Sequence, residues 1–453
     1  MKTFELSKEI IQEISNLISI KKNKEIKKLV DGIHYADLAE IINELESTKR
    51  IYLIKIIDSD KTSDVLTEVD EDVREEILKT LSEKEIAGEI KELDSDDAVD
   101  ILSELSDEKQ EKVISLIKDE SITENIRELL NYDEDSAGGL MAKELISVNE
   151  NWSVLKCLRE IRKQAKDIKR VHSIYVLNKK KILIGRLSLK DLITSPSKSK
   201  IQEIYIPKVD YVHVNDSADE VAKLMSKYDL EAIPVVGNNN ELLGRITIDD
   251  IVDFIKDEAE EDYLLAGGIM TGDIEADDSI FELTKARLPW LILGLFGGLG
   301  SVFILESFEN IMASKELRAL FFYTPLIAAM AGNVGVQSSA IVVQGLANDL
   351  IKGSLISRLI KEVSLTILNG LILSIIIILF GLGINQSLEM SITISVSMIF
   401  VIIVAALIGT SVPILLDKFG IDPAIATGPF ITTGNDVIGI LLFFYIAKLI
   451  LVF

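Results

Sequence analysis

Five long apolar segments near the C-terminal end of this 453-residue chain constrain its fold more than any other feature. They run approximately over 289–308, 321–347, 363–383, 392–416 and 424–452. A helix needs roughly 20 mostly apolar residues to cross the hydrocarbon core of a bilayer. One such segment could be a buried helix of a soluble protein. Five in succession, with almost no charge inside them, predict a membrane domain of five helices.

The residues before these segments hold nearly all of the charge. The chain has 48 Lys and Arg and 72 Asp and Glu residues, of which only 8 and 9 lie in 286–453. The first 285 residues therefore carry a net charge of −23. Nucleic acid is not an expected partner of this soluble half, because phosphate contacts need a basic surface. Divalent cations are natural partners for it.

The sequence offers no candidate catalytic residues. Cys157 is the single cysteine, which excludes an intrachain disulfide framework, and the three histidines have no zinc-ligand spacing. Neither a nucleophile elbow nor a phosphate-binding loop is found. The first ten residues lack the apolar core of a secretory signal peptide. We therefore expect a protein that is not an enzyme.

Basic residues at the ends of the apolar segments predict the orientation in the cell (inner) membrane. Six of them lie on the side of the soluble half and three on the opposite side. Cytoplasmic loops are the ones enriched in Lys and Arg. We therefore expect the N-terminal domains in the cytoplasm, and an odd number of spans then places the C-terminus outside.

Two of the apolar segments carry polar residues at mid-depth. The second contains GNVGVQSS over 332–339, and the fifth contains GPFITTGND over 428–436. Pro429 lacks a backbone N–H, so we expect a kink there that frees carbonyl groups. Asp436 is an acidic residue within an expected span, and such a residue indicates a functional site. The alternative is a protonated carboxyl group buried against Asn333.

The residues around Asp436 suit a hydrated metal ion. Mg²⁺ prefers oxygen ligands and gives up its water reluctantly, so its sites often use one or two carboxylates. One Asp per chain beside freed carbonyls fits this chemistry. Two such carboxylates facing each other across a two-fold axis fit it better, so we expect a homodimer.

Two segments of the soluble half repeat each other, at 173–193 and 232–252. Each predicts a strand, a turn, a strand and a helix, and each follows a helix, at 154–164 and 218–227. Residues 1–130 instead show helical periodicity with short polar breaks. Similar strings at 37–45 and 97–105 predict a small superhelical all-α domain.

Carboxylates gather on helical faces of the soluble half. Asp96 and Asp100 are four residues apart, and Asp250, Asp253 and Glu261 fall on one face of a helix that leads to the membrane. Like charges four residues apart destabilise a helix by about 0.2–0.5 kcal/mol per pair. Such a face is ordinarily a solvated surface. Cations that bridge it to other acidic surfaces would relieve the repulsion.

The strings RLPW (287–290), PLIAAMAGNVGVQS and DPAIATGPFITTGNDVIG resemble the signature segments of the MgtE magnesium channels, and the repeat resembles a tandem pair of CBS domains. The resemblance implies a multidomain chain with an acidic α-helical N-terminal domain at 1–135 and α+β CBS domains at 138–200 and 201–255. It also implies an acidic linking (plug) helix and connection at 249–285, and a five-helix transmembrane pore domain at 286–453. Such CBS pairs often bind adenine nucleotides, so ATP joins Mg²⁺ as a candidate cofactor.

The resemblance also implies site residues. Asp436 would bind Mg²⁺ in the pore, with Thr432, Gly428 and Asn333 on the same ion path, although some members have a polar residue in place of Val336. Where some relatives have another acid, this chain has Ser217, for which Asp216 could substitute. The regulatory Mg²⁺ positions map onto Asp96, Asp100, Asp219, Asp229, Asp250, Asp253, Glu258, Glu261, Asp262 and Asp422.

The function expected is a Mg²⁺-selective channel for magnesium uptake, gated by cytosolic Mg²⁺. At low Mg²⁺ the acidic domains repel each other and the gate opens; at high Mg²⁺ bridging ions hold it shut, by their higher affinity for the closed state. Two alternatives stay open. One is an ion-coupled secondary transporter of divalent cations, with Asp436 as a proton relay. The other is a membrane-anchored CBS sensor.

Overall fold

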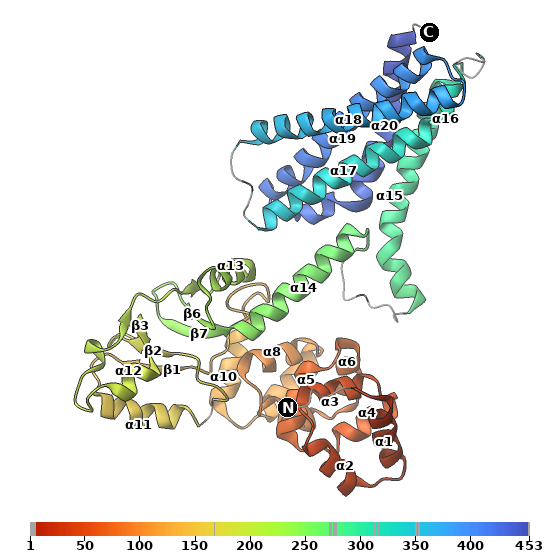
Figure 1. Ribbon diagram of the computed structural model, residues 1–453. Coiled ribbons are helices and arrows are strands. Elements are labelled where there is room, and N and C mark those ends of the chain that lie inside the picture. The colour runs from red at the N-terminus through yellow and green to blue at the C-terminus, as the bar shows by residue number, and fades with distance from the viewer. Residues whose placement is uncertain are drawn as a thin grey trace. The chain divides into compact units, whose positions relative to one another are not determined.

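The computed structural model describes residues 6–166, 168–270, 274, 279–310, 314, 317–348, 351 and 354–451. The chain divides into a soluble unit that ends at Ile255 and a membrane unit that begins at Lys256 (Figure 1). Each unit has its own hydrophobic core. Residues 271–273 and 275–278 of the expected connection lie outside the described residues.

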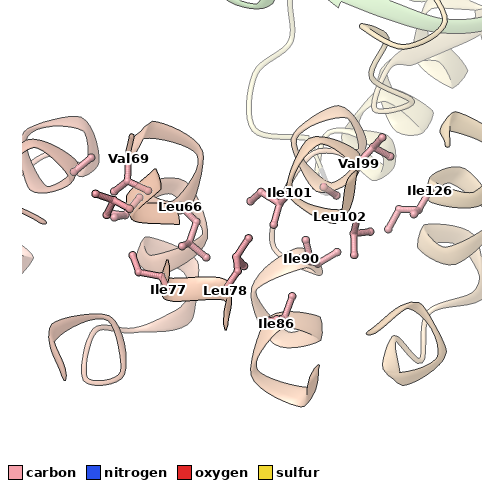
Figure 2. Packing of buried hydrophobic residues seen from close by; sticks show 14 of the residues in the cluster. Leu66, Val69, Ile77, Leu78, Ile86, Ile90, Val99, Ile101, Leu102 and Ile126 are labelled. Atoms are coloured by element: carbon pink, nitrogen blue, oxygen red, sulfur yellow. The ribbon is translucent and has the colours of Figure 1, made fainter. Parts of the chain in front are cut away.

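The soluble unit begins with ten short helices, and no strand occurs among described residues 6–129, as the sequence predicts. Polar caps separate the helices; Ser82 and Glu85, for example, form a capping box at the start of one of them. Aliphatic side chains from successive helices meet in one continuous core, including Ile77, Ile86 and Leu102 (Figure 2). The helices are α1 (Lys8–Ser19), α2 (Asn23–Asp31), α3 (Tyr35–Asn43), α4 (Ser47–Ile54), α5 (Ser59–Glu68), α6 (Glu71–Thr80), α7 (Glu83–Ile90), α8 (Ser95–Ser103), α9 (Asp107–Leu116) and α10 (Glu120–Leu129).

The repeated segments contribute to two small sheets. Each sheet has one parallel strand pair; the first has two antiparallel pairs and the second has one. The first contains β1 (Ile146–Asn149), β2 (Ile174–Leu177), β3 (Leu183–Leu187) and β4 (Ile206–Pro207), with α11 (Val154–Gln164), α12 (Leu189–Thr194) and the 3₁₀ turn η1 (Ile201–Glu203). The second contains β5 (Val212–His213), β6 (Ala232–Val236) and β7 (Leu242–Thr247), with α13 (Ala218–Tyr228). The predicted order of helix, strand, turn, strand and helix is confirmed in both copies.

The helix α14 (Ile248–Ala266) follows β7 directly, and the sequence boundary between the two units falls within its residues. The Asp250 carboxylate accepts hydrogen bonds from the backbone N–H and the hydroxyl of Thr247, at 2.9 and 2.6 Å. These bonds fix the start of the helix. The predicted acidic linking helix is therefore present.

The membrane unit contains five helices long and apolar enough to cross a bilayer, as predicted. Its first helix begins nine residues before the predicted start at 289, because Ser279 and Glu282 form a capping box; Pro289 lies inside the helix. Helices α17, α18, α19 and α20 pack side by side (Figure 1). The elements are α15 (Ile280–Ser307), α16 (Ala319–Phe322), α17 (Thr324–Ala347), α18 (Leu355–Gly383), α19 (Leu388–Lys418), the 3₁₀ turn η3 (Pro423–Ala426) and α20 (Gly428–Leu451).

The kink expected within the fifth span is wrong. A 3₁₀ turn ends at Ala426, and α20 begins at Gly428, whose φ of +42° suits glycine. Pro429 therefore lies in the first helical turn, where its missing N–H has no intrahelical acceptor to lose. The span is broken before Pro429 rather than bent at it. A carbonyl at the break, that of Ala426, accepts a hydrogen bond from Ser339 Oγ at 2.7 Å.

Candidate ion pathway and regulatory sites

The third turn of α20 contains buried polar groups that have no hydrogen-bond partner among the described residues. Asn435 is 1% exposed. Its amide oxygen and nitrogen and Oδ1 of Asp436 are buried with no hydrogen-bond partner in the described part of the chain. A buried polar group left unpaired costs about 1–3 kcal/mol. The turn therefore holds oxygen atoms that are free to bind a ligand.

Glycines of α17 allow this turn to lie against the neighbouring helix. A Cβ atom added to Gly332 would lie 3.1 Å from Oδ1 of Asp436 and 2.9 Å from Cγ2 of Thr432. A Cβ atom added to Gly335 would clash with the Asn435 amide. Thr432 Oγ1 donates to the Gly428 carbonyl at 2.9 Å. Three of the predicted pore residues, Gly428, Thr432 and Asp436, therefore lie on successive turns at the start of α20.

Asn333, the fourth predicted pore residue, follows Gly332 on α17 but does not face this contact. It is exposed, as are Gln337 and Gln344 on the same side of α17. The α17 residue that approaches Asp436 is the neighbouring glycine, Gly332. In hydrocarbon, polar groups must face protein or water. This exposed polar stripe therefore marks a face of α17 that does not suit lipid.

In the soluble unit, carboxylates of α8 lie close to the start of α14. Burial and the nearby Asp94 and Asp250 carboxylates raise the pKa of Asp97 to about 7. Burial and Asp250 raise the pKa of Asp100 to about 6 and also raise that of Asp96. Burial raises the pKa of Asp250 itself. The structure thus brings Asp96 and Asp100 together with Asp250.

Two members of this group, Asp94 and Asp97, were not among the candidates that the sequence suggests. The buried guanidinium of Arg245 lies 3.6 Å from the Asp94 carboxylate and also donates from Nε to the carbonyl of Glu144. We call Asp94, Asp96, Asp97, Asp100 and Asp250 the α8–α14 acidic cluster. Asp253 follows Asp250 by three residues on α14, and its charge contributes, after burial, to a raised pKa of Glu68.

The remaining regulatory candidates lie at other positions along the chain. Asp219 is exposed in the first turn of α13, which Ser217 caps; Asp216 accepts from the His213 backbone N–H at 2.7 Å. Asp229 is exposed with a left-handed φ of 51°. Asp422 caps η3 by accepting from Ala424 N–H at 2.8 Å. Glu258, Glu261 and Asp262 follow along α14. Within the described residues, no three His, Cys, Asp or Glu side chains form a group arranged to hold a metal ion.

A cavity of about 320 Å³ lies in the first CBS-like segment, beside β2 and β3. Its lining includes His172, Ser173, Arg186 and Ser188. A guanidinium and two hydroxyl groups suit an anionic ligand with hydrogen-bonding oxygens.

The sequence does not single out Glu362 of α18, because the third predicted apolar segment begins at 363. Helix α18 begins at Leu355, so Glu362 lies within it. Its carboxylate accepts a hydrogen bond from Ser338 Oγ on α17 at 2.6 Å. The signal that could have identified it is the helix start at Leu355, which lies before the apolar segment.

Comparisons with known proteins agree with this arrangement. A family model described as a divalent cation transporter matches residues 324–446, one described as the MgtE intracellular N domain matches 33–135, and the CBS domain model matches 137–198 and 201–257. The magnesium transporter MgtE of Bacillus subtilis is 37% identical over 322 residues, 70% of each chain. The magnesium transporter MgtE of Thermus thermophilus is 34% identical over 325 residues, 71% of this chain and 72% of the relative.

Two solved structures resemble the soluble half. The soluble part of a magnesium transporter is 28% identical with a TM-score of 0.51, and the match covers 55% of this chain and 98% of that one. The cytosolic domain of the Mg²⁺ channel MgtE in complex with ATP is 31% identical with a TM-score of 0.51, covering 54% of this chain and 99% of that one.

Proposed function

Because the chain belongs to the MgtE family of magnesium transporters, we propose that it is a Mg²⁺-selective channel whose pore closes when cytosolic Mg²⁺ binds to its soluble half. The observation that carries this proposal is the unsatisfied polar turn of α20. A spanning helix that served only as an anchor would gain nothing from a buried Asn435 and Asp436 without partners.

The permeating ion meets the Asp436 carboxylate as it passes α20. Mg²⁺ binds oxygen and retains several of its waters, so one carboxylate with nearby hydroxyl and carbonyl oxygens is an adequate ligand set. Thr432 and Gly428 supply such oxygens one and two turns before Asp436. The glycines of α17 let that helix pack closely against this turn.

The pore of this channel lies at the interface of a homodimer. The exposed stripe of Asn333, Gln337 and Gln344 on α17 supports this arrangement, because a second copy or a water-filled path would cover these polar groups. A two-fold axis beside α17 and α20 would also bring two Asp436 carboxylates to one ion. The soluble half is cytoplasmic and the C-terminus is outside, as the flanking basic residues predict.

Closure depends on the α8–α14 acidic cluster. Burial, and after it the repulsion between these carboxylates, raises the pKa values of Asp97 and Asp100 to about 7 and about 6. A divalent cation between α8 and α14 would remove this repulsion, so Mg²⁺ favours the arrangement in which they approach. Asp219, Asp229, Asp253, Glu258, Glu261, Asp262 and Asp422 are further regulatory candidates, each contributing a weaker share.

ATP is a candidate ligand of the CBS pair. The solved cytosolic domain of an MgtE channel that resembles this chain carries ATP. The cavity beside Arg186 offers a cationic group and hydroxyls for a polyphosphate or ribose.

Flux into liposomes that contain the purified protein tests the proposal. Mg²⁺ should enter wild-type liposomes down its own gradient, with no Na⁺ or H⁺ gradient, and Asp436→Asn should abolish this entry while size-exclusion chromatography still shows a dimer. Glu389→Gln changes an exposed acid at the start of α19 in the same way and should conduct normally. Normal flux in Asp436→Asn removes this residue from the pathway, and flux that needs a counter-ion gradient replaces the channel with a coupled transporter.

A further inference from the structure

A half-open cavity of about 250 Å³ lies between helices α17 and α18, on the side of α17 away from Asp436, and Ile402 of α19 also lines it. Its lining mixes apolar side chains with five oxygen-bearing ones: Gln337, Ser338, Glu362, Thr366 and Asn369. At about 30 Å³ for each water, the cavity has room for several waters or a partly hydrated ion. An apolar site for lipid would not need this many polar groups.

Glu362 is the charged residue of this cavity. It lies on α18, one of the five helices that are long and apolar enough to cross a membrane. No ion pair joins it to a Lys, Arg or His side chain within the described ranges. Its recorded side-chain partner there is the Ser338 hydroxyl, which donates to one carboxylate oxygen at 2.6 Å. A half-buried carboxylate without a basic partner is costly, so a cation is the missing complement.

The cavity lies beside the proposed pore without being part of the Asp436 turn. Ser338 and its neighbour Ser339 point to different elements: Ser338 donates to Glu362 on α18, and Ser339 donates to the Ala426 carbonyl just before α20. Gly332, which approaches Asp436, precedes Ser338 by six residues, a rise of about 9 Å along α17. The two carboxylates thus contact α17 at different heights and on different sides.

We propose that this cavity is a second cation site of the membrane half, in which the Glu362 carboxylate and the oxygens of Gln337, Ser338 and Asn369 hold a partly hydrated divalent cation. The ligand class follows from the donor set, which is all oxygen with one negative charge and so resembles a Mg²⁺ or Mn²⁺ site rather than a zinc site. The proposal rests on the proposed function in one respect: the cation is assumed to be of the divalent class that the membrane half conducts. An ion here would neutralise the Glu362 carboxylate beside α17, the helix that packs against the Asp436 turn.

The substitution Glu362→Gln separates this role from a structural one. Glutamine has nearly the same shape, and its side-chain oxygen can still accept the Ser338 hydrogen bond, but it removes the charge. Ser338→Ala does the reverse, since it removes the hydrogen bond and keeps the charge. Glu389→Gln, at an exposed position of α19, controls for loss of one acidic charge in the membrane half.

Crystals of the full-length protein grown in MnCl₂ provide the direct test, because Mn²⁺ scatters anomalously. We expect an anomalous peak in the cavity beside Glu362 for wild type, Ser338→Ala and Glu389→Gln, and loss of that peak in Glu362→Gln. A peak at Asp436 with none beside Glu362 in wild type overturns the second site and leaves the proposed pore intact. Persistence of the cavity peak in Glu362→Gln also overturns it.

Mg²⁺ flux into liposomes gives an independent readout. Under this proposal Glu362→Gln raises the Mg²⁺ concentration needed for half-maximal flux, and Ser338→Ala changes it less. The opposite order, with normal flux in Glu362→Gln and impaired flux in Ser338→Ala, overturns the site. That result would mean that the hydrogen bond between Ser338 and Glu362 holds α17 and α18 together and that the charge of Glu362 binds no ion. A wild-type protein without any Mg²⁺ flux refutes the proposed function instead, and the anomalous peaks remain a separate result.

Discussion

Neutralising one carboxylate of the α8–α14 acidic cluster should stabilise the soluble half when no divalent cation is present. The pKa of Asp97 is raised from its usual 3.8 to about 7, first by burial and then by Asp94 and Asp250. Between these two values the folded protein binds more protons than the unfolded chain. Its free energy of unfolding therefore falls as pH rises from about 4 to about 7. Asp97→Asn should remove part of that slope.

The size of the effect follows from the same shift. Roughly three pKa units correspond to at most about 4 kcal/mol. The cluster titrates jointly and is partly open to water, which reduces this to about 2 kcal/mol. Asp97 also lies in the first turn of α8, where a negative charge is favourable by about 0.3–1 kcal/mol, and asparagine loses this. The net gain is about 1 kcal/mol at pH 7.5, or roughly 2–4 °C in Tm.

Thermal unfolding of the soluble half in chelator, followed by circular dichroism between pH 4 and 8, measures this directly. Asp107→Asn is the matched control, since Asp107 is an exposed acid in the first turn of the next helix and should lose stability slightly. Added Mg²⁺ should raise the wild-type Tm more than that of Asp97→Asn. Equal Tm values and equal pH slopes for wild type and Asp97→Asn in chelator would refute the electrostatic account of the cluster.

Three other substitutions follow from the described contacts. Gly335→Ala should destabilise the membrane unit by about 1–3 kcal/mol, because the added Cβ atom would clash with Asn435. The Tm of the detergent-solubilised variant should therefore fall. Gly434→Ala is the control, since its Cβ atom would lie in open space, and its Tm should change less. Arg245→Ala should destabilise the soluble half by about 3 kcal/mol, since it leaves Asp94 uncompensated, and urea unfolding measures this loss. Mg²⁺ should protect the connection before α15 from proteolysis, and combining Asp97→Asn, Asp100→Asn and Asp250→Asn should remove this protection. Unchanged protection in the triple variant would show that other carboxylates hold the ion.

The sequence predicts those parts of this chain in which a local pattern decides the structure. The helix predicted at 154–164 is α11 with the same bounds, and the one at 218–227 is α13, because serine caps and apolar periodicity mark both. The five spans follow from length and hydropathy alone. Their polar starts do not, since the capping box of Ser279 and Glu282 lies outside the apolar segment.

The site residues likewise divide into those that a local sequence pattern identifies and those that depend on contacts between distant segments. Asp436 is visible because one acidic residue in an apolar segment needs no partner to be noticed. The membership of Asp97 in the acidic cluster depends on contact between α8 and α14, which lie far apart in the chain. Glu362 likewise acquires its meaning only when α18 places it against Ser338. The local structure at Pro429 depends on where the preceding 3₁₀ turn ends, and the structure has a helix start there in place of the predicted kink.

The central claim is that cytosolic Mg²⁺ closes a Mg²⁺-conducting pore through the acidic soluble half, and inside-out membrane patches test it most directly. Mg²⁺ current should flow when the cytoplasmic face is bathed in chelator and should disappear when millimolar Mg²⁺ is added to that face. In the protein with Asp97→Asn, Asp100→Asn and Asp250→Asn combined, the current should persist at the same concentration. Closure of that variant at the wild-type Mg²⁺ concentration would contradict the account.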